Sequence, residues 1–183
     1  MSWDPDRFES LVSRMSLTLE GKRPMLDSNV YIFRYPAEME LRCVSEFTRL
    51  IKRLESKNLR SEIIWINKLF VSALQRVDSI ESLSIAEKRD RHLIFNGLSN
   101  VAVGLTVLMA NEISEILKDK QMPYCAVMLR VGSALPFLNL SSILSLLENK
   151  IKCMLILTCP EKDGKIIGTN YTSSNIYPRG EVV

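Results

Sequence analysis

Arg130, Gly132 and Ser133 follow an apolar run of the sequence, and their side-chain types could hold an anion or contact a partner. A phosphate-binding loop uses several glycines and a lysine to bring backbone N–H groups and positive charge to its ligand. This turn has a single glycine, and Pro136 removes one N–H donor. Ligands of open α/β sheets nevertheless bind at the carboxyl ends of strands. We therefore predict these three residues as contacts for an anion or a partner, with a purely structural turn as the alternative.

The residue types that most often carry catalysis form no recognisable constellation here. His92 is the only histidine and lies among charged residues of a predicted exposed helix, and no Gly-x-Ser-x-Gly elbow occurs. Paired carboxylates such as Glu112 and Glu115 have the spacing of ordinary helix-surface residues. The cysteines, at positions 43, 125, 153 and 159, lack the CxxC spacing of a zinc site, so we expect buried free thiols. We predict no catalytic residue, no metal and no cofactor, and a protein that is not an enzyme.

Two apolar runs, Tyr124–Val131 and Lys152–Thr158, flank the candidate turn. Runs without polar alternation are typical of strands buried on both faces, as in a parallel sheet covered by helices. Ser133 can cap a helix between them, and Pro136 suits its first turn. That helix would lay an apolar stripe on the sheet, consisting of Leu135, Leu138, Ser142, Ile143, Leu146 and Leu147. The segment therefore predicts a βαβ unit.

The N-terminal part of the chain predicts a second set of elements. Asp4–Pro5 begins an amphipathic helix, and Val30–Tyr35 forms a strand. Pro36 opens a helix with one apolar face, and Glu62–Asn67 forms the next strand. The apolar face of that helix carries Cys43, Phe47, Leu50 and Leu54.

The interval between the second strand and Tyr124 favours helices throughout. Asn96–Gly97 closes one helix, and Ser99 or Asn100 caps the next. The first half of that next helix, Val101 to Ala110, is apolar nearly all round, so we expect it to be buried in the domain or against a partner. It is too short to cross a bilayer, which takes about 20 apolar residues.

Composition sets the remaining bounds. A chain of 183 residues with 46% hydrophobic and 25% charged residues can bury a substantial core. We expect a single α/β domain over residues 1–183, in three layers. Its mostly parallel sheet has at least four strands and helices on both faces, a Rossmann-like or P-loop-like topology without a Walker A motif. Residues 161–183 are expected to form an edge strand, around Lys165–Gly168, and a loosely ordered tail. The polar, acidic start lacks the features of a secretory signal, so we expect a cytoplasmic protein.

Three consecutive parts of the chain resemble the BrxB family of bacteriophage exclusion (BREX) systems of bacteria. They are Arg130–Leu138, the Leu-rich helix after it, and the strand that ends in Cys159–Pro160 before Asp163–Gly164. Asn29–Tyr35 and Ile63–Phe70 resemble the family's first two strands in the same order. The resemblance covers about Met1 to Gly164. After Gly164 the family carries an aromatic, arginine-containing strand, whereas this chain has only Tyr177 and Arg179 there. An arginine and a histidine expected just after Phe137 are replaced by other residues in the region of Asn139 and Leu140.

The resemblance implies a noncatalytic component that docks onto other proteins of a phage-defence assembly and supports phage restriction and host-DNA methylation. It implies an alkaline-phosphatase-like protein as the partner, and also a large ATPase and an adenine methyltransferase in the same system. Trp3, Phe8, Tyr171 and Tyr177 are candidate contacts or, alternatively, core residues.

Two alternatives stay open. The first is a degenerate nucleotide-binding or small-ligand-binding domain that uses Arg130 to Ser133 and Cys159 to Lys162 at the strand ends. The second is direct DNA binding, for which the net charge of +3, dispersed among acidic residues, provides little clustered field. We expect no membrane association.

Overall fold

A mostly parallel sheet lies at the centre of the computed structural model, which describes residues 3–24, 29–77, 91–134, 140–147, 150–163, 165–166 and 181–182. The sheet has the order β2-β3-β4-β1-β6, and each of these neighbouring pairs is parallel. β5 is antiparallel to the end of β4. The strands are β1 (Val30–Pro36), β2 (Arg60–Trp65), β3 (Gln121–Leu129), β4 (Lys152–Lys162), β5 (Lys165–Ile166) and β6 (Glu181–Val182).

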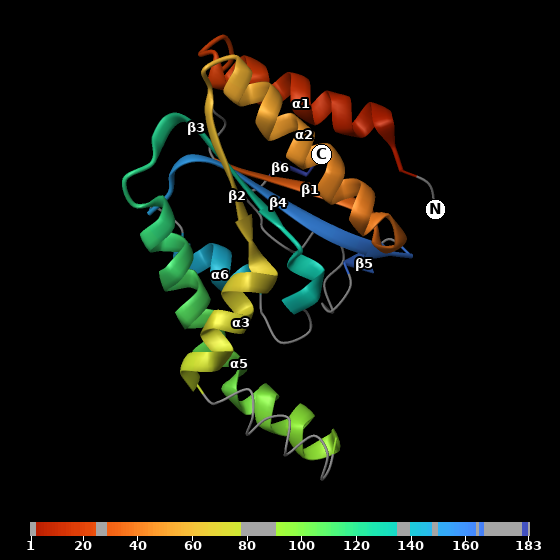
Figure 1. Ribbon diagram of the computed structural model, residues 1–183, viewed down its shortest axis with the longest axis vertical. Coiled ribbons are helices and arrows are strands. Elements are labelled where there is room, and N and C mark those ends of the chain that lie inside the picture. The colour runs from red at the N-terminus through yellow and green to blue at the C-terminus, as the bar shows by residue number, and fades with distance from the viewer. Residues whose placement is uncertain are drawn as a thin grey trace.

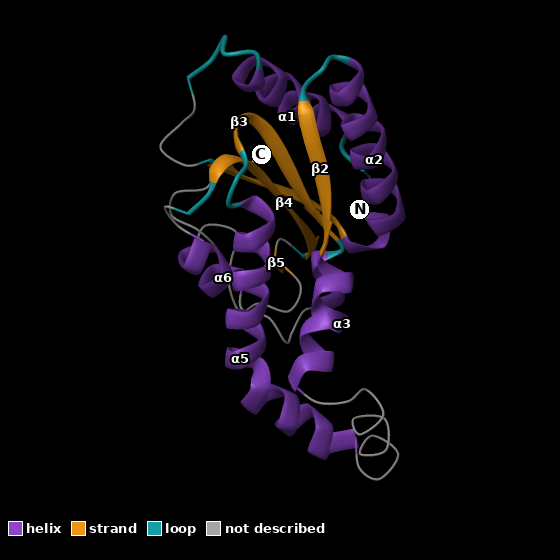
Figure 2. Cartoon of the chain, turned by 60° about the vertical axis from the view of Figure 1, so that its left-hand side comes forward, coloured by secondary structure: helices purple, strands orange, loops and turns teal. Residues whose placement is uncertain are grey.

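Helices cover both faces of this sheet, as Figures 1 and 2 show. One face packs against α1 (Pro5–Leu19) and α2 (Glu40–Ser56), and the other against α3 (Ile66–Val77), α5 (Arg91–Leu117) and α6 (Leu140–Leu147). Because side chains alternate along a strand, Phe33 and Tyr35 join the first layer and Ile32 joins the second. The predicted three-layer α/β fold is confirmed.

The apolar runs form the most buried strands. Tyr124 to Leu129 of β3 and Cys153 to Pro160 of β4 are buried throughout. Both strands therefore take the positions inside the sheet that their lack of polar alternation predicts. The apolar face of α2, with Cys43, Phe47, Leu50 and Leu54, is likewise buried, as predicted.

Several predicted boundaries are wrong. The second strand ends at Trp65, and Ile66 and Asn67 belong to α3, because a short apolar run does not indicate where extended backbone turns helical. α5 continues through Asn96–Gly97 without a break. A glycine inside a helix costs only about 1 kcal/mol, so it need not end one. Figure 1 shows the N-terminal part of α5 running out beyond the sheet.

The turn after β3 also differs from the prediction. Val131–Ala134 forms a short 3-10 helix, η2, and the hydroxyl of Ser133 donates to the carbonyl of Arg130 at 2.6 Å. The described helix α6 begins only at Leu140. Pro136, Leu135 and Leu138 lie outside the described residues. In α6, Ile143 and Leu147 are buried as predicted, whereas Leu146 is 38% exposed.

The connections reverse direction above the carboxyl end of β4. From β1 the chain crosses on the α1/α2 face to β2, at the far edge of the sheet, and then returns on the other face through β3 to β4. The loops after β1 and β3 thus leave toward opposite faces, with β4 between them. Such a switch point is where open α/β sheets bind ligands. Among the described residues, no helix is long and apolar enough to cross a bilayer.

Candidate functional site

The first cluster of polar side chains lies at this switch point and joins the loops after β1 and β3. Tyr35, at the end of β1, donates a hydrogen bond from its hydroxyl to Glu40 Oε2. Glu40 Oε1 lies 3.8 Å from Nε of Arg130. Burial, and then the hydrogen bond to Glu40, raise the pKa of the Tyr35 hydroxyl far above its usual range. Glu40 therefore ties the start of α2 to both strand ends with its two oxygens.

The predicted contacts Arg130, Gly132 and Ser133 lie together in the turn beside this cluster. Arg130 has a φ of 63°, a left-handed conformation that is uncommon for residues other than glycine. Its side chain is 34% exposed. Ser133 is exposed, but its hydroxyl bonds to the Arg130 carbonyl of the same turn.

Gly132 has a packing reason to be glycine. A Cβ at this position would lie 2.9 Å from Cγ of Pro160, which real Cβ contacts do not show. Pro160 is buried near the end of β4, so the turn after β3 packs closely against that strand. Thr158, two residues earlier, donates its hydroxyl to the carbonyl of Met128 at 2.8 Å and joins β4 to β3. The packing therefore supports the alternative of a structural turn.

All four cysteines are buried and free, as predicted. Burial raises the pKa of the Cys159 thiol to about 12 and that of Cys153 to about 11. Burial likewise raises the pKa of Cys43 and Cys125 far above the usual range. These thiols stay protonated at neutral pH and are poor nucleophiles. Within the described ranges, no group of three or more histidine, cysteine or acidic side chains could hold a metal ion.

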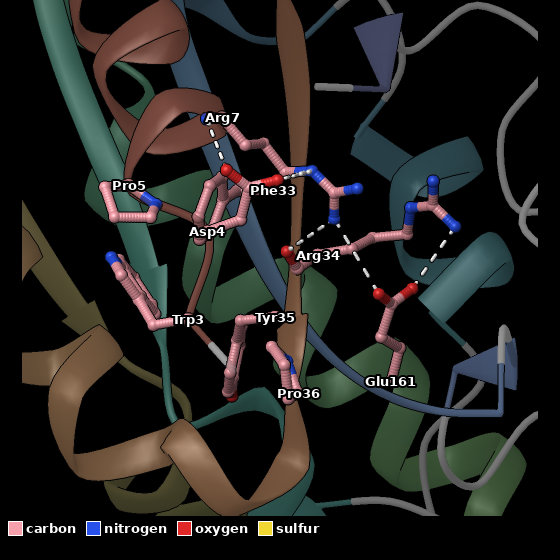
Figure 3. Close-up of a pocket in the computed structure, with 9 residues that line it drawn as sticks. All are labelled: Trp3, Asp4, Pro5, Arg7, Phe33, Arg34, Tyr35, Pro36 and Glu161. Carbon is pink, nitrogen blue, oxygen red and sulfur yellow. Dashed lines mark hydrogen bonds and ion pairs between the residues drawn. The ribbon is translucent and has the colours of Figure 1, made fainter. Parts of the chain in front are cut away.

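A second polar cluster lies at the side of β1 that faces away from β4. Of its residues, the sequence analysis included only Glu161, within Cys159 to Lys162, and did not identify Arg7 or Arg34. Glu161 Oε2, at the end of β4, accepts a hydrogen bond from Arg34 at 3.3 Å. Glu161 Oε1 lies 3.7 Å from NH1 of Arg7 on α1, and the same NH1 donates to the Arg34 carbonyl at 3.4 Å. Figure 3 shows Arg7 and Arg34 approaching the carboxylate from two elements. One carboxylate thus lies between two guanidinium groups.

A pocket of about 550 Å³ adjoins these charges. The side chain of Glu161 is 12% exposed, and that of Arg34 is 20% exposed. Arg34 is the one charged residue within the otherwise apolar strand β1, and that irregularity is the signal by which sequence reasoning could have found the site. The pocket is lined by Trp3, Asp4, Pro5, Arg7, Phe33, Arg34, Tyr35, Pro36 and Glu161.

Two of the predicted partner contacts are core residues. Trp3 is 6% and Phe8 is 5% exposed. Their rings lie 5.6 Å apart and each contacts Phe33, at 5.6 and 5.8 Å between ring centroids. Phe8 also packs edge-on against Phe47 of α2. The alternative reading, that these two residues complete the core, is thus correct for both. Tyr171 and Tyr177 lie outside the described residues.

A second pocket, of about 640 Å³, lies at the opposite end of the sheet, near the starts of β2 and β3. Its polar lining includes Asn58, Arg60, Asp119 and Lys120. The Lys120 ammonium lies 4.9 Å from the ring centre of Tyr124. The ordinary ligand-binding end of a parallel sheet is the carboxyl end, so this pocket is not where the fold predicts a site.

Comparisons of this chain with protein-family models, with curated proteins and with solved structures find no match.

Proposed function

We propose that this chain is a noncatalytic protein-interaction component of a BREX-type phage-defence complex, which supports phage restriction and host-DNA methylation by docking other proteins of the system. The observation that carries the proposal is the state of the switch point. Glu40 bridges Tyr35 and Arg130 there, and Pro160 packs on Gly132. The chain's own side chains thus occupy the position where an α/β enzyme with such a switch point would bind its ligand.

The chemistry of the remaining groups supports the same proposal. The buried thiols are protonated, and the Tyr35 hydroxyl is held neutral by burial and by Glu40. A nucleophile would need the opposite shift of its pKa, towards ionisation at neutral pH. The two arginines of the second cluster share Glu161, an arrangement that suits recognition of another polypeptide's charges better than proton transfer.

The resemblance to BrxB supplies the proposed partners. The segments that resemble the family lie on defined elements of the fold: Asn29–Tyr35 on β1, Ile63–Phe70 on the end of β2 and the start of α3, and the described part of the third segment, Arg130–Ala134, in the turn after β3. We therefore propose the alkaline-phosphatase-like protein as the docked partner, with the large ATPase as a further one.

Affinity purification tests this function. The protein is tagged in its native gene neighbourhood, and the co-purifying proteins are identified by mass spectrometry, with an unrelated protein carrying the same tag as the control. Stoichiometric recovery of the phosphatase-like or ATPase component is the expected result. Recovery of the tagged protein alone would contradict the proposal if circular dichroism shows that the recovered protein is folded.

A second candidate function is degenerate nucleotide or small-ligand binding, which one observation favours: the Arg130 side chain is one-third exposed at the carboxyl edge. Calorimetric titration with ATP tests it. Binding tighter than about 100 μM that is lost in Arg130→Ala and Ser133→Ala would support it. A flat titration would eliminate it.

A further inference from the structure

The edge of β1 beyond Ile32, which no strand of the described residues covers, bears on the chemistry of the docked partner. β6 pairs only with Tyr31 and Ile32, whereas β1 continues to Pro36. Beyond Ile32 no described strand lies on this side of β1. The carbonyl of Arg34 points out of that edge, where it accepts a hydrogen bond from Arg7 on α1. An unpaired strand edge is a template for another extended chain.

Arg7 lies at this edge and makes only long contacts there. Its NH1 lies 3.4 Å from the Arg34 carbonyl and 3.7 Å from Glu161, and its Nε lies 3.8 Å from Asp4. Charge-assisted hydrogen bonds of arginine normally measure about 2.7–2.9 Å. None of the three side-chain contacts reaches that range. The guanidinium can therefore turn to a better acceptor at little cost.

Arg34 has spare donor capacity as well. Its NH1 bonds to Glu161, whereas its Nε is buried without a hydrogen-bond partner among the described residues. A buried donor left unsatisfied costs about 1–3 kcal/mol. Glu161 is shared by two guanidinium groups, and it is within hydrogen-bond distance of Arg34 but not of Arg7. Asp4 is half exposed and already caps α1 through the backbone N–H of Arg7.

We infer that the edge of β1 from Phe33 to Pro36 accepts an extended segment of a partner protein that carries an acidic side chain. A backbone N–H of the segment replaces Arg7 at the Arg34 carbonyl, and the segment's carboxylate receives the released guanidinium. The exchange gives the Arg34 carbonyl a new backbone donor and gives the Arg7 guanidinium a carboxylate at closer range than Glu161 or Asp4. Trp3, Tyr35 and Pro36 form the apolar side of the same pocket, which receives the neighbouring side chains of the segment. This inference rests on the proposed function, since it identifies which surface docks a partner and what that partner presents.

The test selects random peptides of about twelve residues, displayed on phage, against the purified protein. A selected peptide is then synthesised with a fluorophore and titrated by anisotropy. The enriched peptides are expected to carry glutamate or aspartate among β-branched residues. Replacing that acid by its amide, or introducing Arg7→Gln, is expected to weaken binding about tenfold or more.

Matched variants keep the outcome interpretable. Arg49→Gln removes an arginine whose side chain is 71% exposed on α2, and it should leave the affinity unchanged. Arg7→Lys keeps the charge but loses the planar fork, so it should fall between wild type and Arg7→Gln. Circular dichroism verifies that each variant is folded. No enrichment, or an affinity indifferent to both Arg7→Gln and the peptide's acid, would overturn the inference.

Hydrogen exchange tests the strand pairing itself. Bound peptide is expected to slow amide exchange in Phe33–Tyr35, and unchanged exchange there would overturn the strand pairing. Repeating the affinity purification with Arg7→Gln separates the two proposals. If the defence proteins still co-purify with Arg7→Gln, the proposed function stands and the edge is not their docking site. If none co-purifies even with wild type, the proposed function fails, and the peptide titration alone decides whether the edge binds acidic segments.

Discussion

At the turn after β3, one absent methyl group allows the ends of two strands to meet. A Cβ on Gly132 would lie 2.9 Å from the ring of Pro160, which is itself buried and cannot swing away. We expect Gly132→Ala to lower the free energy of unfolding by about 1–3 kcal/mol, the usual cost of overpacking. Urea denaturation measures it. Gly104→Ala is the matched control.

The control should shift stability in the opposite direction. Gly104 lies inside α5, and a Cβ there would meet nothing within 4 Å. Alanine at such a helical position is expected to stabilise the protein by about 0.5–1 kcal/mol. Equal effects of the two substitutions would show that the contact with Pro160 does not determine the choice of glycine at 132.

The buried thiols predict a loss of stability in alkaline solution. Burial raises the pKa of Cys159 from 9.0 to about 12 and that of Cys153 to about 11. Above pH 9 the unfolded chain therefore binds fewer protons than the folded one, and stability falls as the pH rises. The stabilisation is complete below pH 9 and is lost progressively towards the folded pKa values. Each such thiol contributes a slope of about 1.4 kcal/mol per pH unit.

Urea denaturation in the presence of reductant, at pH values from about 8 to 10.5, measures this slope. Cys159→Ala is expected to be less stable at pH 8 but to lose stability less steeply as the pH rises, by the share of one thiol. Identical slopes in wild type and variant would be inconsistent with a buried, protonated Cys159.

Prediction succeeded for those residues whose side chain has one main structural role in a protein. The cysteines are buried free thiols because cysteine behaves as a small hydrophobic side chain and these residues lie in apolar strands or on the apolar face of a helix. Ser133 was expected to cap a helix, and it instead bonds to the carbonyl three residues before it. The same hydroxyl can make either hydrogen bond, and the course of the backbone around Ser133 decides which one forms. Arg34 escaped notice because its meaning depends on Arg7 and Glu161, which are distant in sequence.

Among the elements, α1 depends most on its first residues. Asp4 caps the helix by accepting from the backbone N–H of Arg7 at 3.0 Å, and Pro5 follows in the first helical position. We expect Asp4→Ala to lower the free energy of unfolding by about 1 kcal/mol. Asp4→Asn keeps a capping oxygen and should cost much less. Thermal melts followed by circular dichroism provide the measurement.

Asp6→Ala controls for the loss of a negative charge near the helix start. Asp6 is exposed in the first turn, where its charge interacts favourably with the helix dipole, so its removal is expected to cost a few tenths of a kcal/mol, up to about 1. A larger loss for Asp6→Ala than for Asp4→Ala would mean that charge, and not the cap, stabilises the start of α1.

Elements with a strong period were predictable, and their ends were not. β3, β4 and α2 follow directly from unbroken apolar runs or from a single apolar face. α5 is apolar on nearly every side from Val101 to Ala110, so its sequence contains no period there that would separate one long helix from two shorter ones. Glycine and asparagine at 96–97 are weak stop signals, and the helix continues through them.

At the scale of the molecule, the class of fold was predictable but the order of its strands was not. Parallel pairing follows from buried strands alternating with helices. The order β2-β3-β4-β1-β6 depends on pairings such as Val30 with Leu155 and Tyr31 with Glu181, which no local pattern encodes. The second polar cluster is a consequence of that order, because β1 and β4 must be neighbours before Arg34 can reach Glu161.

The two layers of the core share one sheet, and this predicts how the whole molecule unfolds. The tryptophans Trp3 and Trp65 report on the α1/α2 layer, whereas Cys153 and Cys159 belong to the layer under α3, α5 and α6. Because every residue from Cys153 to Pro160 of β4 is buried between the layers, neither layer can open without exposing the other. Tryptophan fluorescence and thiol labelling of Cys153 are therefore expected to give the same urea midpoint.

Phe47→Ala makes this test decisive. Phe47 is 0% exposed in the α1/α2 layer, and its truncation is expected to cost about 3–5 kcal/mol. If residues 1–183 form one cooperative domain, the midpoint of Cys153 labelling falls together with that of tryptophan fluorescence, although Cys153 lies across the sheet. A shift confined to the fluorescence would instead divide the chain into two units. The docking surface on β1 would then belong to the less stable unit, since its pocket is built largely from α1, β1 and the aromatic residues that pack on Phe47.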